Sequence, residues 1–252
     1  MSYMMEVCRA GRTVEIYKYY TAGHPPKGKK RAPKLAPTPE DVKRVNERNA
    51  AKKLRLTMAE NFGPGDVHVV LGYGRGKAPS PEEARKHLEQ FMRKLRQYCK
   101  SHEIVLRYIT VTEYKRKRIH HHVIIPGIPA ADLAELWGHG RPHITPLDGS
   151  GQYSQLADYL IKETSKTFSE PNAPYGKRWC QSKNLRKPNI TKTVVKANAW
   201  RKEPKAKKGY YIEKDSIREG THEVTGYDFQ FYRLVMLDRP QKGGKQVDHG
   251  AI

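Results

Sequence analysis

The chain has 252 residues, of which 48 are Lys or Arg and 26 are Asp or Glu, so its formal net charge at pH 7 is +22. Only 37% of the residues are hydrophobic, and no apolar run approaches the roughly 18 residues that a transmembrane helix needs. The N-terminus lacks a secretory signal pattern, and the three cysteines form neither a disulfide framework nor a CxxC motif. We therefore expect a cytoplasmic protein without membrane partners that binds a polyanion, most simply nucleic acid.

The N-terminal part of the chain predicts one strand, a linker and a helix. Residues 13–19 alternate as a strand does, whereas residues 24–39 combine proline, glycine and lysine and predict an extended or disordered linker. Thr38 is a candidate N-cap with Pro39 behind it, so a helix is expected from there to about Glu60.

The middle of the chain predicts an α+β core. Its expected elements are strands at residues 66–73, 104–114, 119–125 and 143–147, and helices at residues 81–99, 129–137 and 152–163. The first six of these elements read strand, helix, strand, strand, helix, strand. This order is the ferredoxin-like βαββαβ arrangement, an antiparallel sheet with helices on one face and the other face free to carry a site.

Three parts follow from this pattern. Residues 1–37 are expected to form an N-terminal strand and basic linker, and residues 38–165 the core. Residues 166–252 are basic and rich in loops, and they predict a C-terminal extension that packs on the core. An aromatic-rich hairpin is expected near its end, at residues 209–238.

Three adjacent histidines are the most informative residues. Side chains alternate along a strand, so His120 and His122 share one face while His121 points to the other. If the preceding turn is a two- or four-residue loop, Glu113 pairs with His120 and its carboxylate joins both histidines, whereas an odd-length loop places Glu113 beside His121. Two imidazoles and one carboxylate suit Mn²⁺, with Mg²⁺ as the other choice, and leave room for a phosphate oxygen. The alternative is a solvated basic patch.

A metal that polarises a phosphate needs a nucleophile, and the last helix of the core offers Tyr159. At about 100° per residue, Tyr159 and Lys162 lie about 60° apart on one helical face, so the lysine can reach the space in front of the phenol. Such a cation favours phenolate in a side chain whose ordinary pKa is near 10. Tyr153 lies on another face, which suggests a single catalytic tyrosine. The alternative is that Tyr159 packs with Leu156 and Leu160.

Together, His120-x-His122 on a strand and Tyr159-x-x-Lys162 on a later helix resemble the HUH endonuclease superfamily of rolling-circle initiators, relaxases and single-strand transposases. Other segments resemble the rolling-circle replication-associated proteins of Gram-positive bacteria, their phages and mobile elements. They are residues 10–15 (AGRTVE), 61–66 (NFGPGD), 111–114 (VTEY), 178–185 (RWCQSKNL) and 209–211 (GYY). The chain departs from the superfamily at His121, where a bulky hydrophobic residue is usual, and at residues 72–75, where Thr-rich sequence is expected.

The resemblance implies specific roles. His120, His122 and Glu113 would bind the metal, Tyr159 would form a 5′-phosphotyrosine and free a 3′-hydroxyl for synthesis, and Lys162 would assist. The implied function is sequence-specific nicking and rejoining of single-stranded or origin DNA, which initiates rolling-circle replication. No GxxxxGK[ST] phosphate loop occurs, so a host or element helicase and DNA polymerase are expected partners. Residues expected to contact DNA are Arg116, Lys117, Arg118, Arg178, Trp179, Ser182 and Asn184.

Other functions remain open at this point. A mobilisation relaxase or a transposase would use the same chemistry. An RRM-like binder of single-stranded nucleic acid would stack bases on sheet aromatics, and a basic ribosome-associated or regulatory protein would bind without cleaving. The core sheet discriminates between these classes, because an endonuclease places His120, His122 and Glu113 there and a stacking module places aromatic rings.

Overall fold

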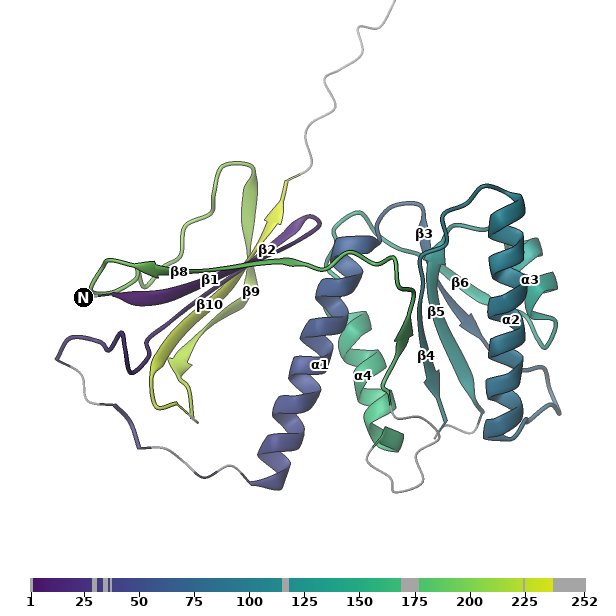
Figure 1. Ribbon diagram of the computed structural model, residues 1–252, viewed down its shortest axis with the longest axis horizontal. Coiled ribbons are helices and arrows are strands. Elements are labelled where there is room, and N and C mark those ends of the chain that lie inside the picture. The colour runs from purple at the N-terminus through teal and green to yellow at the C-terminus, as the bar shows by residue number, and fades with distance from the viewer. Residues whose placement is uncertain are drawn as a thin grey trace, which may run out of the picture.

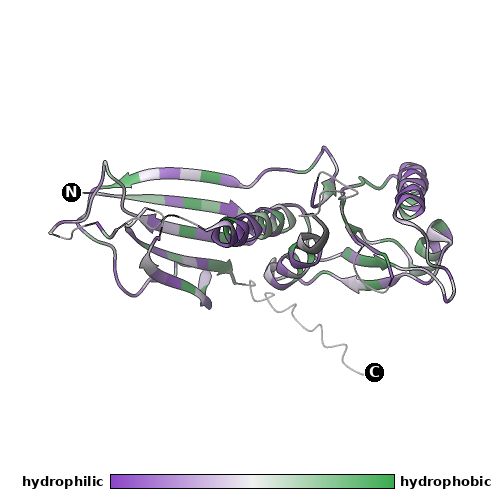
Figure 2. Ribbon diagram, turned by 90° about the horizontal axis from the view of Figure 1, so that it is seen from below, coloured by the Kyte–Doolittle hydropathy of each residue, from purple (hydrophilic) through white to green (hydrophobic). Residues whose placement is uncertain are grey.

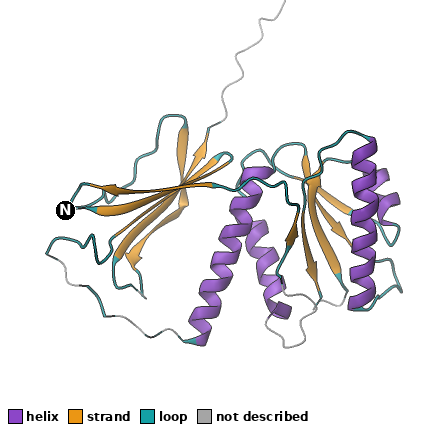
Figure 3. Cartoon of the chain, in the orientation of Figure 1, coloured by secondary structure: helices purple, strands orange, loops and turns teal. Residues whose placement is uncertain are grey.

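The computed structural model describes residues 2–28, 31–33, 36, 38–114, 118–168, 177–223 and 225–237. These residues form two five-stranded antiparallel sheets and four α-helices. Figure 1 shows two of the helices between the sheets and the other two on the outer side of the second sheet, and Figure 3 shows the same layers by element type. Within these described ranges, no helix combines the length and the apolar character needed to cross a bilayer.

The second sheet contains the strands expected between residues 66 and 147. Its order is β6-β3-β5-β4-β7, and all neighbouring strands are antiparallel. The predicted order of strands and helices is confirmed, while β7 is an edge strand that the sequence pattern did not predict. The elements are β3 (Asp66–Leu71), α2 (Pro81–Ser101), β4 (Ile109–Glu113), β5 (His120–Pro126), α3 (Ala130–Trp137), β6 (His143–Pro146) and β7 (Cys180–Gln181).

Helices α2 and α3 cover one face of the second sheet. Helix α2 begins at a capping box, in which the Ser80 hydroxyl accepts from the Glu83 amide and the Glu83 carboxylate accepts from the Ser80 amide. Its apolar stripe then packs on alternate residues of β3 and β5, together with Leu133 and Trp137 of α3. The buried residues of α2 are Ala84, Phe91, Met92, Leu95 and Cys99.

The other face of the second sheet was expected to be free, and this expectation is wrong. Helix α4 (Ser154–Phe168) covers it, and helix α1 (Pro39–Asn61) packs against α4. The physical reason is the apolar character of this face away from the histidines, where Ile109, Val111 and Ile124 need burial and meet α4. The candidate site residues therefore lie at a sheet–helix interface.

The first sheet joins the two ends of the chain, which the sequence analysis treated as an N-terminal strand and a separate C-terminal extension. Its strands, in spatial order, are β8 (Asn189–Val195), β1 (Tyr3–Ala10), β2 (Thr13–Tyr19), β10 (Asp228–Met236) and β9 (Tyr210–Thr221). The predicted closing hairpin is present as β9 and β10. The sequence analysis missed β1, because both of its faces are largely covered and its sequence lacks regular polar alternation. Figure 2 shows hydrophobic and hydrophilic residues mixed along these strands.

The turn between β1 and β2 lies against the end of α1. Gly11 adopts φ +51°, and a Cβ at this position would lie 2.0 Å from the carbonyl oxygen of Ala59. The Gly11 amide donates to the Glu60 carboxylate at 2.9 Å. Only glycine permits this approach of the turn to the helix.

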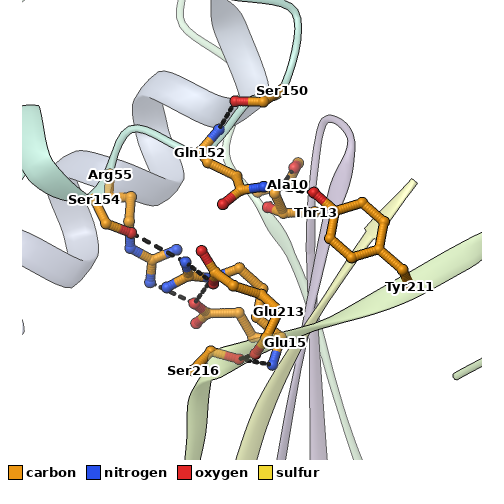
Figure 4. Close-up of polar contacts among 11 residues, drawn as sticks. Ala10, Thr13, Glu15, Arg55, Ser150, Gln152, Ser154, Tyr211, Glu213 and Ser216 are labelled. Atoms are coloured by element: carbon orange, nitrogen blue, oxygen red, sulfur yellow. Dashed lines mark hydrogen bonds and ion pairs between the residues drawn. The ribbon is translucent and has the colours of Figure 1, made fainter. Parts of the chain in front are cut away.

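A buried ion cluster connects the first sheet to α1 and α4 (Figure 4). The Glu15 carboxylate on β2 is 2% exposed and accepts from Arg55 of α1 and, at 3.4 Å, from Arg233 of β10. Arg233 also pairs with Glu213 of β9 and donates at 3.0 Å to the hydroxyl of Ser154, the first residue of α4. Five elements therefore meet at one pair of guanidinium groups.

We predict that Glu15→Gln lowers the free energy of unfolding by about 3–5 kcal/mol, because it leaves Arg55 and Arg233 buried without their shared counter-charge. Urea denaturation followed by circular dichroism measures this change. Glu89→Gln is the matched control, since it removes an exposed carboxylate 3.8 Å from Arg85 and should change stability by less than about 0.5 kcal/mol. Equally small effects of both substitutions would contradict the importance of the cluster.

Candidate active site

The pairing of β4 with β5 brings the predicted ligands to one face. Glu113 lies opposite His120, and Val111 lies opposite His122. This is the register expected from an even-length connection, and the alternative with Glu113 beside His121 is wrong. Because side chains alternate along both strands, Glu113, His120 and His122 all point towards the α4 side of the sheet.

Two of these side chains are in contact. Nε2 of His122 lies 2.8 Å from Oε1 of Glu113, and the two side chains are 5% and 2% exposed. Nδ1 of His122 lies 3.0 Å from Nε2 of His68 on β3, and the rings stack with 5.2 Å between centroids. The ring of Tyr159 on α4 meets His122 edge to face, at 5.7 Å between centroids. Three neighbouring strands and one helix therefore supply a single cluster.

The sequence analysis missed His68. Burial, together with His122 and His143, lowers the pKa of the His68 imidazole to about 4, so this ring is neutral at pH 7. A neutral imidazole can donate to or accept from Nδ1 of His122, and either hydrogen bond holds the His122 ring with Nε2 towards Glu113. The available signal was the alternation of β3, in which Val67 and Val69 enter the α2 core and His68 must face the other way.

His120 shares this face but is half exposed. It lies beside Gly72, where an added Cβ would be 3.4 Å from the His120 ring, so the glycine in the segment that departs from the superfamily leaves space for this imidazole. Across the described ranges, no group of three or more His, Cys, Asp or Glu side chains is assembled as a metal site.

The atoms of Glu113 and His122 nevertheless fit a metal. Two donors that each lie about 2.1 Å from an octahedral ion are about 3 Å apart, close to the 2.8 Å observed between His122 Nε2 and Glu113 Oε1. An imidazole nitrogen and a carboxylate oxygen are also donors that Mn²⁺ accepts. His120 matches the third ligand by its position in the strand pairing.

His121 points to the opposite face, as predicted. Its ring is fully buried, with Nδ1 2.9 Å from the Thr112 hydroxyl and Nε2 3.1 Å from the Tyr73 hydroxyl. Burial lowers the pKa of His121 to about 3, so the ring is neutral. Both ring nitrogens have partners, which explains how a histidine occupies a position where the superfamily usually has a hydrophobic residue.

The two tyrosines near α4 have different surroundings. Tyr159 is half buried beside His122, and Lys162 is exposed one turn later. Tyr153 precedes the helix, and its buried hydroxyl lies 3.2 Å from the carbonyl oxygens of Phe62 and Asp148. Burial raises the pKa of Tyr153 to about 12, which disfavours phenolate. Tyr153 is therefore a packing residue, and the nucleophile assigned to Tyr159 stays a prediction.

The basic residues predicted to contact DNA are only partly placed. Arg116 and Lys117 lie outside the described residues, and Arg118 is exposed. Arg178 donates to a serine hydroxyl in α4, and Trp179 lies 6.0 Å from the Lys53 ammonium. Both stand close to the helix that carries Tyr159, and their contact with DNA stays a prediction.

Ser182 and Asn184 have partners within the fold. The Ser182 hydroxyl is buried and accepts from the Tyr108 amide at 3.1 Å, and the Asn184 amide donates to the Leu106 carbonyl at 3.1 Å. These bonds continue the edge pairing of β7 along the segment that leads into β4. The polar motif therefore has a structural part, and its role in DNA binding stays a prediction.

Comparison with known proteins agrees with this geometry. Residues 66–168 match the family model of the replication-associated proteins of the ORF2 and gene II protein type. The match extends from β3 to the end of α4 and includes every side chain of the candidate site. No match was found among curated proteins or among solved structures. The resemblance to replication-associated proteins is thereby confirmed, and it associates this segment with DNA replication.

We predict that His121→Leu lowers the free energy of unfolding by roughly 1–3 kcal/mol, because it leaves the buried hydroxyls of Thr112 and Tyr73 without a partner. Adding Tyr73→Phe to the variant should recover part of this loss, since it removes one unpartnered hydroxyl. Denaturant unfolding of the two variants and of Tyr73→Phe alone measures the coupling. Strictly additive losses would contradict the hydrogen bond.

Proposed function

We propose that the chain is a metal-dependent HUH endonuclease that nicks and rejoins single-stranded DNA and so initiates rolling-circle replication. The observation that carries this proposal is the contact of His122 with Glu113, directly beside Tyr159. The family match over residues 66–168 and the net charge of +22 support it. A replication enzyme of this kind needs a polyanion surface, a phosphate-activating centre and a nucleophile.

We infer that the second sheet is a ferredoxin-like HUH core. In the order β6-β3-β5-β4, each helix connects two strands that have one antiparallel strand between them, as in the split βαβ units of that fold. Strand β7 and helices α1 and α4 would be additions to this core. The inference is supported by the antiparallel pairing of all four strands.

His120, His122 and Glu113 would hold Mn²⁺ or Mg²⁺. When bound, such an ion polarises the phosphate and neutralises charge that develops on it. Strand pairing positions Glu113 beside His122, and His68 bonds to Nδ1 of His122 so that Nε2 remains the ligand atom. Close to its own pKa of about 4, His68 would protonate and this positioning bond would change.

Tyr159 would be the nucleophile. Its phenolic oxygen forms a bond to phosphorus while the bond from phosphorus to the 3′-oxygen breaks, which leaves a 5′-phosphotyrosine and a 3′-hydroxyl. Lys162, one turn along α4, would favour the phenolate that this attack needs. Return attack by a 3′-hydroxyl on the phosphotyrosine reverses the step and rejoins a strand. A helicase and a DNA polymerase of the host or element would then extend the free end.

A relaxase or transposase would use the same residues, so the nicking chemistry is common to these alternatives. An RRM-like stacking role for the second sheet has less support. The α4 face of this sheet carries His68, Glu113 and His122 rather than aromatic rings, and α4 covers it. The endonuclease is therefore the function that this geometry supports best.

We predict that Tyr159→Phe abolishes strand cleavage and the covalent adduct while leaving stability nearly unchanged, because it removes one oxygen and little volume. The assay incubates the protein with a single-stranded oligonucleotide library and Mn²⁺, and mass spectrometry locates the adduct. Tyr153→Phe is the matched control and should cleave like the wild type, though with some loss of stability from its buried hydrogen bonds. An adduct on Tyr153, or robust hydrolysis without an adduct, would refute the nucleophile.

We predict that the double variant His120→Ala/His122→Ala loses metal-dependent cleavage but keeps salt-sensitive DNA binding, because the surplus of Lys and Arg makes the phosphate contacts. Gel assays of nicking and fluorescence anisotropy of DNA binding give the two readouts. Nicking at the wild-type rate by a folded double variant would show that these histidines are not the ligands.

A further inference from the structure

The first sheet carries a group of aromatic side chains that the candidate active site does not use. Tyr17 and Tyr19 of β2 stack with 4.9 Å between ring centroids and 26° between planes, and Phe229 of β10 lies 5.7 Å from Tyr17. Strand pairing places Phe231 opposite Tyr17 and Phe229 opposite Tyr19. We call these four half-buried side chains the aromatic strip.

The aromatic strip lies on the face of the first sheet that packs on α1, since Tyr17 and Tyr19 follow Glu15 at steps of two. Helix α1 covers only one end of this face. Its buried residues begin at Ala51, and residues 39–50 include no buried side chain. The strip continues past the packed part of the helix and stays partly accessible. Figure 1 shows that this sheet and the second sheet lie on opposite sides of α1 and α4, so the strip is separate from the candidate active site.

Cationic side chains border the aromatic strip. The strand pairing puts Lys192 of β8 and Arg218 of β9 in the same cross-strand row as Tyr17, and both are exposed. Burial raises the pKa of Tyr17, and the exposed Arg48 of α1 opposes this rise, which places a third cation near the ring. Glu6 lies in the same row but is paired with Lys192 at 3.3 Å. Three cations thus accompany one carboxylate.

We propose that the aromatic strip and its bordering cations bind single-stranded DNA of any sequence. Partly exposed rings on a sheet can stack only with unpaired bases, because a duplex hides the faces of its bases. Lys192, Arg218 and Arg48 would contact the phosphates, in keeping with the net charge of +22. DNA is the polyanion that the replication-associated family match favours. The proposal requires no chemistry at Tyr159 and goes beyond the nicking function.

The test compares the intact chain with the variant Tyr19→Leu/Phe229→Leu, which keeps apolar side chains but removes two stacking rings. Anisotropy with a labelled oligo-dT of about 12 nucleotides should show binding weakened about tenfold or more. Binding to a duplex of equal length should stay at the wild-type value, and the salt dependence should keep its slope because the phosphate contacts remain. Tyr211→Leu is the control, since it removes an exposed ring of β9 outside the strip.

A second variant, Lys192→Gln/Arg218→Gln, tests the cations separately. Removing two phosphate contacts should reduce the slope of log affinity against log salt by about 1.4 for the single strand. Wild-type oligo-dT binding by a folded Tyr19→Leu/Phe229→Leu variant would overturn the proposal, and so would an equal loss for the duplex. Sedimentation of the wild type as a dimer that this variant dissociates would instead make the strip an interface between copies.

Discussion

The buried carboxylate of Glu15 is the constraint on which the arrangement of this protein depends. A charge in the interior costs several kcal/mol unless it is paired, and here Arg55 of α1 and Arg233 of β10 both reach it. Arg233 also bonds to Ser154, at the start of α4. The first sheet, which is made from both ends of the chain, therefore holds the start of the helix that carries Tyr159 and is more than an appendage to the core.

Two periodicities then assemble the candidate site. The alternation of β4 and β5 turns Glu113 and His122 to the same face, while the helical period of α4 buries Leu160 and Ile161 and leaves Tyr159 beside His122. Strand β3 contributes His68 from the next position in the sheet. The cluster has little exposed surface, so its electrostatic interactions are stronger than they would be in water. A phosphate centre gains from these conditions.

Much of this could be predicted from local patterns. The capping box before α2 and the parity of His120, His121 and His122 depend on residues close in sequence, and both are confirmed. The contacts of Glu15 with Arg233 and of His68 with His122 join residues that are far apart, and only tertiary structure brings them together. The covered sheet face and the shared first sheet were missed for the same reason. Roles in metal binding and catalysis depend on chemistry that a fold pattern cannot supply.

The most direct test of this account is the position of a bound metal. Crystals of the protein soaked with Mn²⁺ should give an anomalous difference peak about 2.1–2.3 Å from both Nε2 of His122 and a carboxylate oxygen of Glu113, on the side facing Tyr159. Crystals of His122→Ala should lack this peak. A peak elsewhere in the wild type, or an unchanged peak in the variant, would contradict the assignment of this cluster as the phosphate-activating centre.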